Sequence, residues 1–177
     1  MKRNNIKMKL KEYFFRNPTK RLRVRQIERE VSIPLPSAIR YTKELEEEEI
    51  INKEEIGNVI FYSADIGSKK YLIEKKLYNI GSLFDMGLIA FLVEELGNPD
   101  IVLFGSFFRG DDLEESDIDL FIQTVSKKKL DVTKFEKKLQ RKIQLFTHKK
   151  IGLIRNKHLI NNIMNGATLN GFVEVVK

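Results

Sequence analysis

The residues with the clearest chemical potential lie in the second half of the chain. Gly105 and Ser106 follow the apolar run 100–104, and Asp117 and Asp119 come shortly after them. A glycine lets a phosphate approach the backbone closely, and a serine hydroxyl beside the amides that begin a short helix adds a hydrogen-bond donor. This turn is therefore a candidate anion site.

Asp117 and Asp119 are two positions apart in a segment where acidic and apolar residues alternate. On a β-strand both carboxylates project from one face, while Ile118 and Leu120 project from the other. Two carboxylates this close repel each other unless a cation neutralises them, and their hard oxygens suit Mg²⁺ or Mn²⁺ bound together with substrate phosphates. An anion-binding turn beside a carboxylate pair favours phosphoryl or nucleotidyl transfer.

Positioning these groups requires a strand, the Gly-Ser turn, an acidic loop and a second strand. Runs 100–104 and 118–122 are the predicted strands, preceded by a helix over 83–96. A helix, a strand over 142–146 and a helix in the tail 159–176 are expected to complete this half of the chain. Turns are predicted at Asn165-Gly166 and Asn170-Gly171.

At these residues the sequence resembles the minimal nucleotidyltransferase family of the DNA polymerase beta superfamily. The family's signature is a hydrophobic residue, Gly-Ser, a short spacer, and Asp-x-Asp between hydrophobic residues. Phe104-Gly105-Ser106 and Asp117-Ile118-Asp119 match it, and Asp117 stands eleven positions after Ser106. Further matches, in the spacer, are Arg109, Gly110 and Ser116. The resemblance is carried by this motif over 100–122 and by element order alone from there to the C-terminus.

The resemblance implies a role for each matching residue. Asp117 and Asp119 are expected to be the catalytic, metal-ligating pair, with Mg²⁺ or Mn²⁺ as the cofactor. Gly105, Ser106 and Arg109 are expected to bind the triphosphate of ATP or another nucleoside triphosphate. The implied reaction transfers a nucleoside monophosphate to a hydroxyl acceptor and releases pyrophosphate. Because some members are antitoxins that nucleotidylate a partner toxin, a protein acceptor of that kind is an expected partner.

Members of the family commonly carry a third acidic residue on the next strand, where it binds metal or activates the attacking hydroxyl. In this sequence the inward position of that strand is Gln144, a neutral amide that cannot act as a base and is a poor ligand for Mg²⁺. Three outcomes stay open: slow transfer, a base supplied by the substrate or a partner, or a domain that only senses nucleotide. Glu136, on the preceding helix, is an unsupported substitute.

The first 66 residues predict three helices followed by a hairpin. Apolar residues recur at helical spacing in three segments, and β-rich runs 50–53 and 59–62 follow. The third helix is expected to be capped by Ser37 and to bury Ile39. Over 13–64 this order resembles winged helix-turn-helix regulators, in which the third helix enters the major groove of DNA and the hairpin touches phosphate.

Positive charge is concentrated at the start of the chain, where residues 1–29 hold eleven basic and two acidic side chains. DNA is therefore an expected partner, with phosphate contacts supplying most of the affinity. The acidic stretch 44–49 would repel a duplex unless it points away, so protein docking or a purely structural role stays open. The candidate DNA-binding residues are Ser37, Arg40, Tyr41 and Lys43 on the third helix, and Arg21, Arg23 and Arg25 near the DNA backbone.

The expected fold class is α+β in three parts. A winged helix-turn-helix domain occupies 1–66, a linker helix 67–80, and a polymerase-beta-like nucleotidyltransferase domain 81–177, whose short mixed sheet is flanked by helices. The linker helix is expected to pack its apolar residues between the two halves. The rival function is a DNA-binding transcriptional regulator whose second domain is catalytically weak or inactive and senses nucleotide. Assembly of identical copies of the chain stays open.

Composition excludes several classes of site. There is no cysteine, so disulfides, thiolate catalysis and cysteine-ligated metals are ruled out. His148 and His158 lie ten positions apart in a basic segment and give a histidine-based metal site or a Ser-His pair little to build on. No stretch approaches about 18 apolar residues and the N-terminus does not read as a signal peptide, so a cytoplasmic location is expected.

Overall fold

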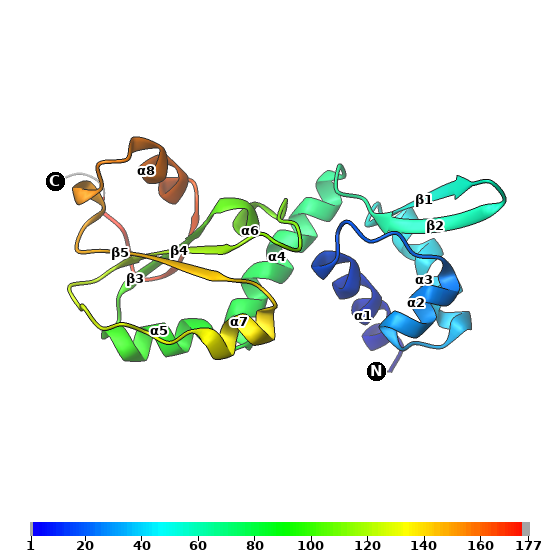
Figure 1. Ribbon diagram of the computed structural model, residues 1–177, viewed down its shortest axis with the longest axis horizontal. Coiled ribbons are helices and arrows are strands. Elements are labelled where there is room, and N and C mark those ends of the chain that lie inside the picture. The colour runs from blue at the N-terminus through cyan, green and yellow to red at the C-terminus, as the bar shows by residue number, and fades with distance from the viewer. Residues whose placement is uncertain (1, 175–177) are drawn as a thin grey trace. The chain divides into compact units, whose positions relative to one another are not determined.

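The computed structural model describes residues 2–174, with side chains from residue 6 onward, and divides into two compact units. Unit 1 is Met1–Tyr78 and unit 2 is Asn79–Lys177. The elements of unit 1 are α1 (Lys2–Arg16), α2 (Val24–Val31), α3 (Leu35–Glu47), β1 (Ile51–Ile56) and β2 (Val59–Ala64) (Figure 1). The predicted order of three helices and a hairpin is confirmed.

Strands β1 and β2 form an antiparallel hairpin that is longer than the sequence predicted. Their pairing runs from Ile51 opposite Ala64 to Ile56 opposite Val59, so only Gly57 and Asn58 remain for the turn. Gly57 has a φ of +52°, a left-handed conformation that glycine adopts without a steric penalty. The predicted connection of five residues was therefore too long, because strand pairing extends to the turn.

The core of unit 1 collects apolar side chains from all three helices. Phe14 of α1, Ile27 of α2 and Leu45 of α3 are fully buried. Tyr71, from helix α4 (Lys69–Asp85), is buried in the same cluster, and its hydroxyl donates to the carbonyl of Phe14 at 3.2 Å. The start of α4 therefore belongs to the core of unit 1.

Helix α3 is rotated relative to the prediction. Tyr41 is buried and Ile39 is 55% exposed, the reverse of what was expected. The helix begins at Leu35 with Pro34 as its N-cap, so Ser37 lies inside the first turn and does not cap the helix. Its buried positions, Ala38, Tyr41, Thr42 and Leu45, share one face at helical spacing. The larger aromatic ring takes the interior place, and the helix turns Ile39 to the surface.

Helix α4 extends across the boundary between the units and ends at Asp85, and α5 (Leu88–Leu96) follows after a break. The single helix predicted over 83–96 is therefore wrong, because Gly87 adopts a φ of +76° between the two helices. Ile73 and Leu77 of α4 are 58% and 64% exposed. Within the described residues no single helix is long and apolar enough to cross a membrane; α4 and α5 reach that length and composition only together, across a 52° bend.

Unit 2 is built on a four-stranded mixed sheet with strand order β5-β4-β3-β6. β3 pairs antiparallel with β4 and β6, and β4 pairs parallel with β5. The elements that follow α5 are β3 (Asp100–Phe104), α6 (Gly105–Arg109), β4 (Ile118–Gln123), α7 (Thr133–Leu139), β5 (Ile143–His148), the 3₁₀ helix η1 (Ile151–Leu153), α8 (Lys157–Met164) and β6 (Ala167–Asn170). This arrangement of a small mixed sheet and helices agrees with the expected α+β class.

Strand β6 was not predicted. It is four residues long, from Ala167 just after the predicted turn at Asn165-Gly166 to Asn170, the first residue of the other predicted turn. So short a segment carries little β pattern of its own. Its conformation is set by pairing with β3, where Leu103 lies opposite Ala167 and Val102 opposite Thr168.

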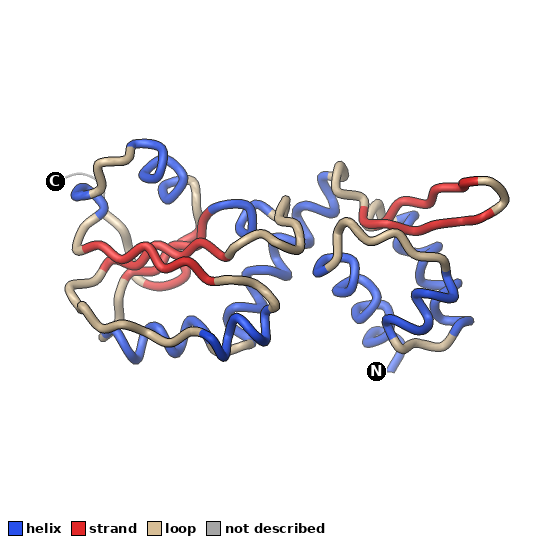
Figure 2. Tube along the Cα trace, in the orientation of Figure 1, coloured by secondary structure: helices blue, strands red, loops and turns tan. Residues whose placement is uncertain are grey.

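Helices cover both faces of the sheet (Figures 1 and 2), and each face has its own hydrophobic layer. Ile118, Leu120 and Ile122 of β4 are fully buried in the layer that includes α5 and α7. Phe121, on the opposite face, is buried in the layer that includes α8. Asp119 alternates with Ile118 and Leu120, so its side chain lies on the α8 side of the sheet.

The rotation of α3 can be tested with a matched pair of variants. Tyr41→Ala should destabilise unit 1 by roughly 3–5 kcal/mol, because it leaves a cavity in the core. Ile39→Ala should change stability by less than about 0.5 kcal/mol, because the side chain is exposed. Urea unfolding followed by circular dichroism measures both. A larger loss for Ile39→Ala than for Tyr41→Ala would contradict the structure.

Candidate active site

Strand pairing brings three sequence-distant segments to one end of the sheet. Phe104, at the end of β3, lies opposite Asp119 near the start of β4, and Asp119 lies opposite Gln144 near the start of β5. Gly105 follows Phe104 directly and begins α6. The Gly-Ser turn, the aspartate pair and Gln144 therefore meet at this end.

Gly105 is required by close contact with Asp119. Its φ is +78°, and a β-carbon at this position would lie 2.3 Å from Oδ2 of Asp119. Any side chain here would be strained and would displace the carboxylate. The sequence predicted a glycine for phosphate approach, and the structure adds that this glycine makes room for the aspartate. Ser106 is half-buried in the first turn of α6, where backbone N–H groups lack partners within the helix.

Asp117 and Asp119 are both half-buried, and β4 begins between them at Ile118. The pKa of Asp119 is raised above its ordinary value, first by burial and then by the negative charge of Asp117. The positive charge of Arg109 acts in the opposite direction on the same pKa. The fold therefore holds two carboxylates where at least one ionises with difficulty unless a cation is present.

The donor set of this pair fits a hard divalent cation. Carboxylate oxygens are the ligands that Mg²⁺ and Mn²⁺ prefer, and Mg²⁺ is usually held by one or two carboxylates together with substrate phosphates and water. No cluster of three or more histidine, aspartate or glutamate side chains suited to a metal occurs in the part of the chain that the structure describes. Asp117 and Asp119 would thus need the substrate and water to complete the coordination.

Arg109 stands at the end of α6, with its side chain 56% exposed. Its Nε donates to Oδ2 of Asp111 at 3.0 Å. Because its charge also lowers the pKa of Asp119, Arg109 contributes positive potential to the carboxylate pair. If a phosphate oxygen took the place of the Asp111 carboxylate as its hydrogen-bond partner, the Arg109 guanidinium would bind that phosphate.

Gln144 contacts the aspartate pair directly. Its side-chain amide donates to Oδ2 of Asp117. The position where the family resemblance leads one to expect a carboxylate therefore holds a hydrogen-bond donor. This amide orients Asp117 but cannot accept a proton from an attacking hydroxyl.

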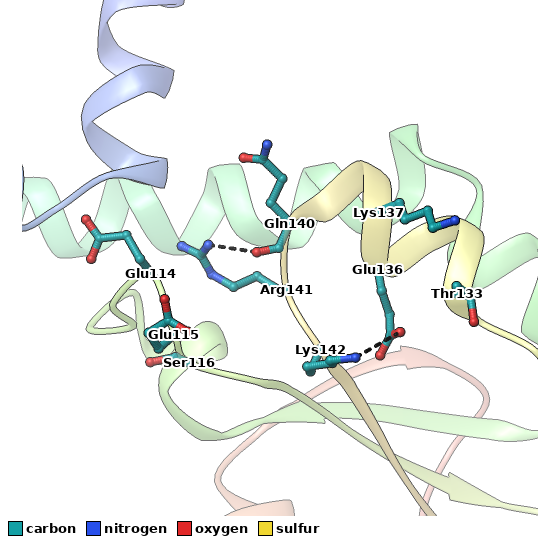
Figure 3. Close-up of a pocket in the computed structure, with 9 residues that line it drawn as sticks. All are labelled: Glu114, Glu115, Ser116, Thr133, Glu136, Lys137, Gln140, Arg141 and Lys142. Carbon is teal, nitrogen blue, oxygen red and sulfur yellow. Dashed lines mark hydrogen bonds and ion pairs between the residues drawn. The ribbon is translucent and has the colours of Figure 1, made fainter.

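Glu136 does not take the place of a third carboxylate. Its Oε1 accepts from the backbone N–H of Ile143 at 3.0 Å, and its Oε2 lies 3.9 Å from Nζ of Lys142. It lines a pocket of about 380 Å³ on the α7 side of the sheet, together with loop 114–116 (Figure 3). Asp119 lies on the other side of the sheet, so Glu136 is not brought to the aspartate pair.

The predicted DNA-binding residues divide into exposed and buried side chains. Ser37 is half-buried and Tyr41 is buried, so Tyr41 offers no free surface for DNA and its assignment to the exposed face of the third helix is corrected. The exposed residues are Arg21, Arg23, Arg25, Arg40 and Lys43.

Several of these cations already have partners inside unit 1. Nη1 of Arg21 lies 3.1 Å from Oε2 of Glu54, and Nε of Arg40 donates to Glu44 at 2.7 Å. The guanidinium of Arg23 lies 5.4 Å from the centre of the Phe61 ring. Binding to phosphate would therefore compete with these contacts.

Two buried residues near the Gly-Ser turn were missed by sequence reasoning. Asn79 and Asp112 are each only 2% exposed. Asp112 is one of several acids in the predicted acidic loop, and Asn79 belongs to no motif. Only the folded structure shows that they meet, because 33 positions separate them.

Residues 86–170 match the model of a protein family described as a nucleotidyltransferase domain. The matched range includes the Gly-Ser turn, both aspartates and all four strands of the sheet. No curated protein and no solved structure matches the chain. The match confirms the nucleotidyltransferase part of the sequence-based assignment and supports a transferase activity that moves a nucleotide.

The contact between Gly105 and Asp119 predicts the effect of adding one methyl group. Gly105→Ala should destabilise unit 2 by about 1–3 kcal/mol, because alanine is strained at this φ and its methyl group meets the carboxylate. Gly81→Ala, on helix α4, is the matched control: no atom lies within 4 Å of the added carbon, and stability should rise by up to about 1 kcal/mol. Urea unfolding measures both. Equal stability of the two variants would contradict the geometry.

The raised pKa of Asp119 predicts how stability depends on pH without divalent cations. The protonated form is favoured in the fold, so this contribution is present below the ordinary pKa of 3.8 and is lost as pH rises through the raised value. Asp119→Asn should therefore melt at a higher temperature than the wild type at pH 7 in EDTA, and the difference should shrink near pH 4. Added Mg²⁺ should stabilise the wild type alone.

Glu115→Gln is the control for this comparison, because Glu115 is an exposed acid in the loop that precedes β4. It should leave the pH profile unchanged. An Asp119→Asn variant that melts below the wild type in EDTA at pH 7 would refute the electrostatic reading of the site.

Proposed function

We propose that this protein is a Mg²⁺- or Mn²⁺-dependent nucleotidyltransferase that moves a nucleoside monophosphate from a nucleoside triphosphate such as ATP to a hydroxyl acceptor. The nucleotidyltransferase domain at 86–170 is the premise. The observation that carries the proposal is the Asp119 carboxylate, which lies against Gly105 with Asp117 beside it. Because the carboxylate pair lies next to the Gly-Ser turn, one metal-bound nucleoside triphosphate could contact both.

Each residue of the site has a part in this reaction. Asp117 and Asp119 would hold the divalent ion, which when bound neutralises phosphate charge and orients the triphosphate. The backbone and hydroxyl of Ser106 and the guanidinium of Arg109 would bind phosphate oxygens. The acceptor oxygen forms a bond to the α-phosphorus, the bond from that phosphorus to the bridging oxygen breaks, and pyrophosphate leaves.

The proton of the acceptor hydroxyl needs a destination. Gln144 cannot take it, because its amide is neutral and donates to Asp117. We assign the base to the acceptor itself or to the protein that carries it. A hydroxyl of a partner protein is the acceptor that this assignment favours, and a toxin partner is the case suggested by the family resemblance.

We further propose that unit 1 is a winged helix-turn-helix domain that binds DNA. Support comes from its three helices and hairpin and from the exposed cations Arg23, Arg25 and Lys43. Two of the acidic residues that could repel DNA point toward α1: Glu44 and Glu48 both accept from Nζ of Lys7. Glu54 and Glu55 in the hairpin are exposed and weigh against a hairpin that touches phosphate.

A second function is favoured by Gln144. If the missing base has abolished transfer, the domain would bind nucleotide without reacting, and unit 1 would be the effector of a DNA-binding regulator. The two functions differ in what Asp117 does. In the enzyme it supports label transfer, and in the sensor it supports only a nucleotide-dependent change in DNA affinity.

Label transfer tests the proposed reaction. The protein is incubated with Mg²⁺ or Mn²⁺ and each α-labelled nucleoside triphosphate, with and without protein lysate from its source. We expect label on a protein band, and a decrease of roughly a hundredfold or more in Asp117→Asn and Asp119→Asn, because charge stabilisation in the transition state is lost. Glu115→Gln should transfer label like the wild type.

The outcomes separate the two functions. Label that persists in both aspartate variants would contradict the assignment of the site. Nucleotide binding without transfer, together with a DNA affinity that shifts with nucleotide and loses this shift in Asp117→Asn, would establish the sensor instead.

A further inference from the structure

Three buried polar side chains from distant parts of unit 2 meet next to the Gly-Ser helix. Nδ2 of Asn79 donates to the carbonyl of Phe107 and to Oδ1 of Asp112, both at 2.8 Å. Nη2 of Arg141 lies 3.7 Å from Oδ2 of Asp112, and these two side chains are 7% and 1% exposed. We call Asn79, Asp112 and Arg141 the polar cluster.

The polar cluster links the elements that carry the candidate active site. Asn79 is on α4, and Phe107 is the third residue of α6, the helix that begins with Gly105 and Ser106. Asp112 lies just after the end of that helix. Arg141 follows α7 and stands three positions before Gln144; it extends toward the loop that carries Glu114 (Figure 3). The polar cluster therefore joins α4 to α6, to the loop that follows α6, and to the segment between α7 and β5.

Burial makes the geometry of this cluster specific. A buried carboxylate that loses a partner pays a desolvation penalty, so Asp112 favours the one arrangement in which both Asn79 and Arg141 face it. The orientation of the Asn79 side chain is restricted in the same way, because its amide nitrogen donates to a backbone carbonyl and to a carboxylate at once. Apolar side chains could fill this space but would not fix the rotation and depth of a helix as short as α6.

We propose that Asn79, Asp112 and Arg141 are positioning residues for nucleotide binding. They hold α6 so that the Gly-Ser turn keeps its contact with Asp119 and presents Ser106 and Arg109 to the triphosphate. They act through α6 rather than by contact with the phosphates. This inference rests on the proposed function, because it assigns the cluster to the same site.

The first test replaces the residue that joins α4 to α6. Asn79→Ala removes both hydrogen bonds, and we expect the Kd for a non-hydrolysable nucleoside triphosphate with Mg²⁺ to rise about tenfold. Ser82→Ala is the matched control. Ser82 is also buried on α4, but its hydroxyl donates a 2.7 Å hydrogen bond to the carbonyl of Asn79, within the same helix. Its variant should bind nucleotide within twofold of the wild type.

Hydrogen exchange of the protein without nucleotide gives a readout independent of the reaction. Asn79→Ala should increase amide exchange over 105–112 about tenfold, whereas Ser82→Ala should not. If Asn79→Ala does not fold, Asp112→Asn takes its place: it retains the shape and one oxygen acceptor but removes the charge that faces Arg141. Asp112→Asn should likewise raise the Kd for nucleotide and increase amide exchange over 105–112.

Two results would overturn the inference. A folded Asn79→Ala variant with wild-type exchange over 105–112 would show that the cluster does not position α6. Equal effects of Asn79→Ala and Ser82→Ala on affinity and exchange would show that both follow overall stability. If the wild type binds no nucleotide, the proposed function fails, while the exchange comparison still decides whether the cluster holds α6.

Discussion

The arrangement at the candidate active site depends on a close approach between the Asp119 carboxylate and the α-carbon of Gly105. The register of β4 enforces this approach. Ile118 and Leu120 are fully buried on one face, and a slip of one residue would turn them to the other face, so Asp119 must point to the α8 side beside the end of β3. Apolar burial thus holds a carboxylate in a place where burial and Asp117 make its ionisation costly.

That cost explains what the site is suited to bind. Under the proposed function, a divalent cation would relieve the repulsion between the two aspartates, and the turn that follows β3 would offer donors to the phosphates that accompany such a cation. Gln144 leaves the site without a third carboxylate that could act as a base, because its amide occupies that position and donates to Asp117. Binding of a metal-nucleotide complex is therefore better supported by the residues present than activation of the acceptor hydroxyl.

The meeting of the Gly-Ser turn and the aspartate pair could be predicted from the sequence, because it depends on a motif of fixed spacing and on strand alternation. The α+β class and the element order of unit 1 followed from hydrophobic periodicity in the same way. Features that depend on tertiary pairing could not be predicted: the rotation that buries Tyr41 instead of Ile39, the strand β6 that forms only against β3, and the contact of Asn79 with Asp112. The break at Gly87 was missed because apolar spacing continues across it.

The central claim is that Asp117 and Asp119 bind a divalent cation together with a nucleoside triphosphate. Isothermal titration with a non-hydrolysable triphosphate, in Mg²⁺ and in EDTA, tests it without depending on an acceptor. The account predicts binding by the wild type only in Mg²⁺, and loss of that binding in the Asp117→Asn, Asp119→Asn double variant. Binding of equal strength in EDTA, or in the double variant, would contradict it.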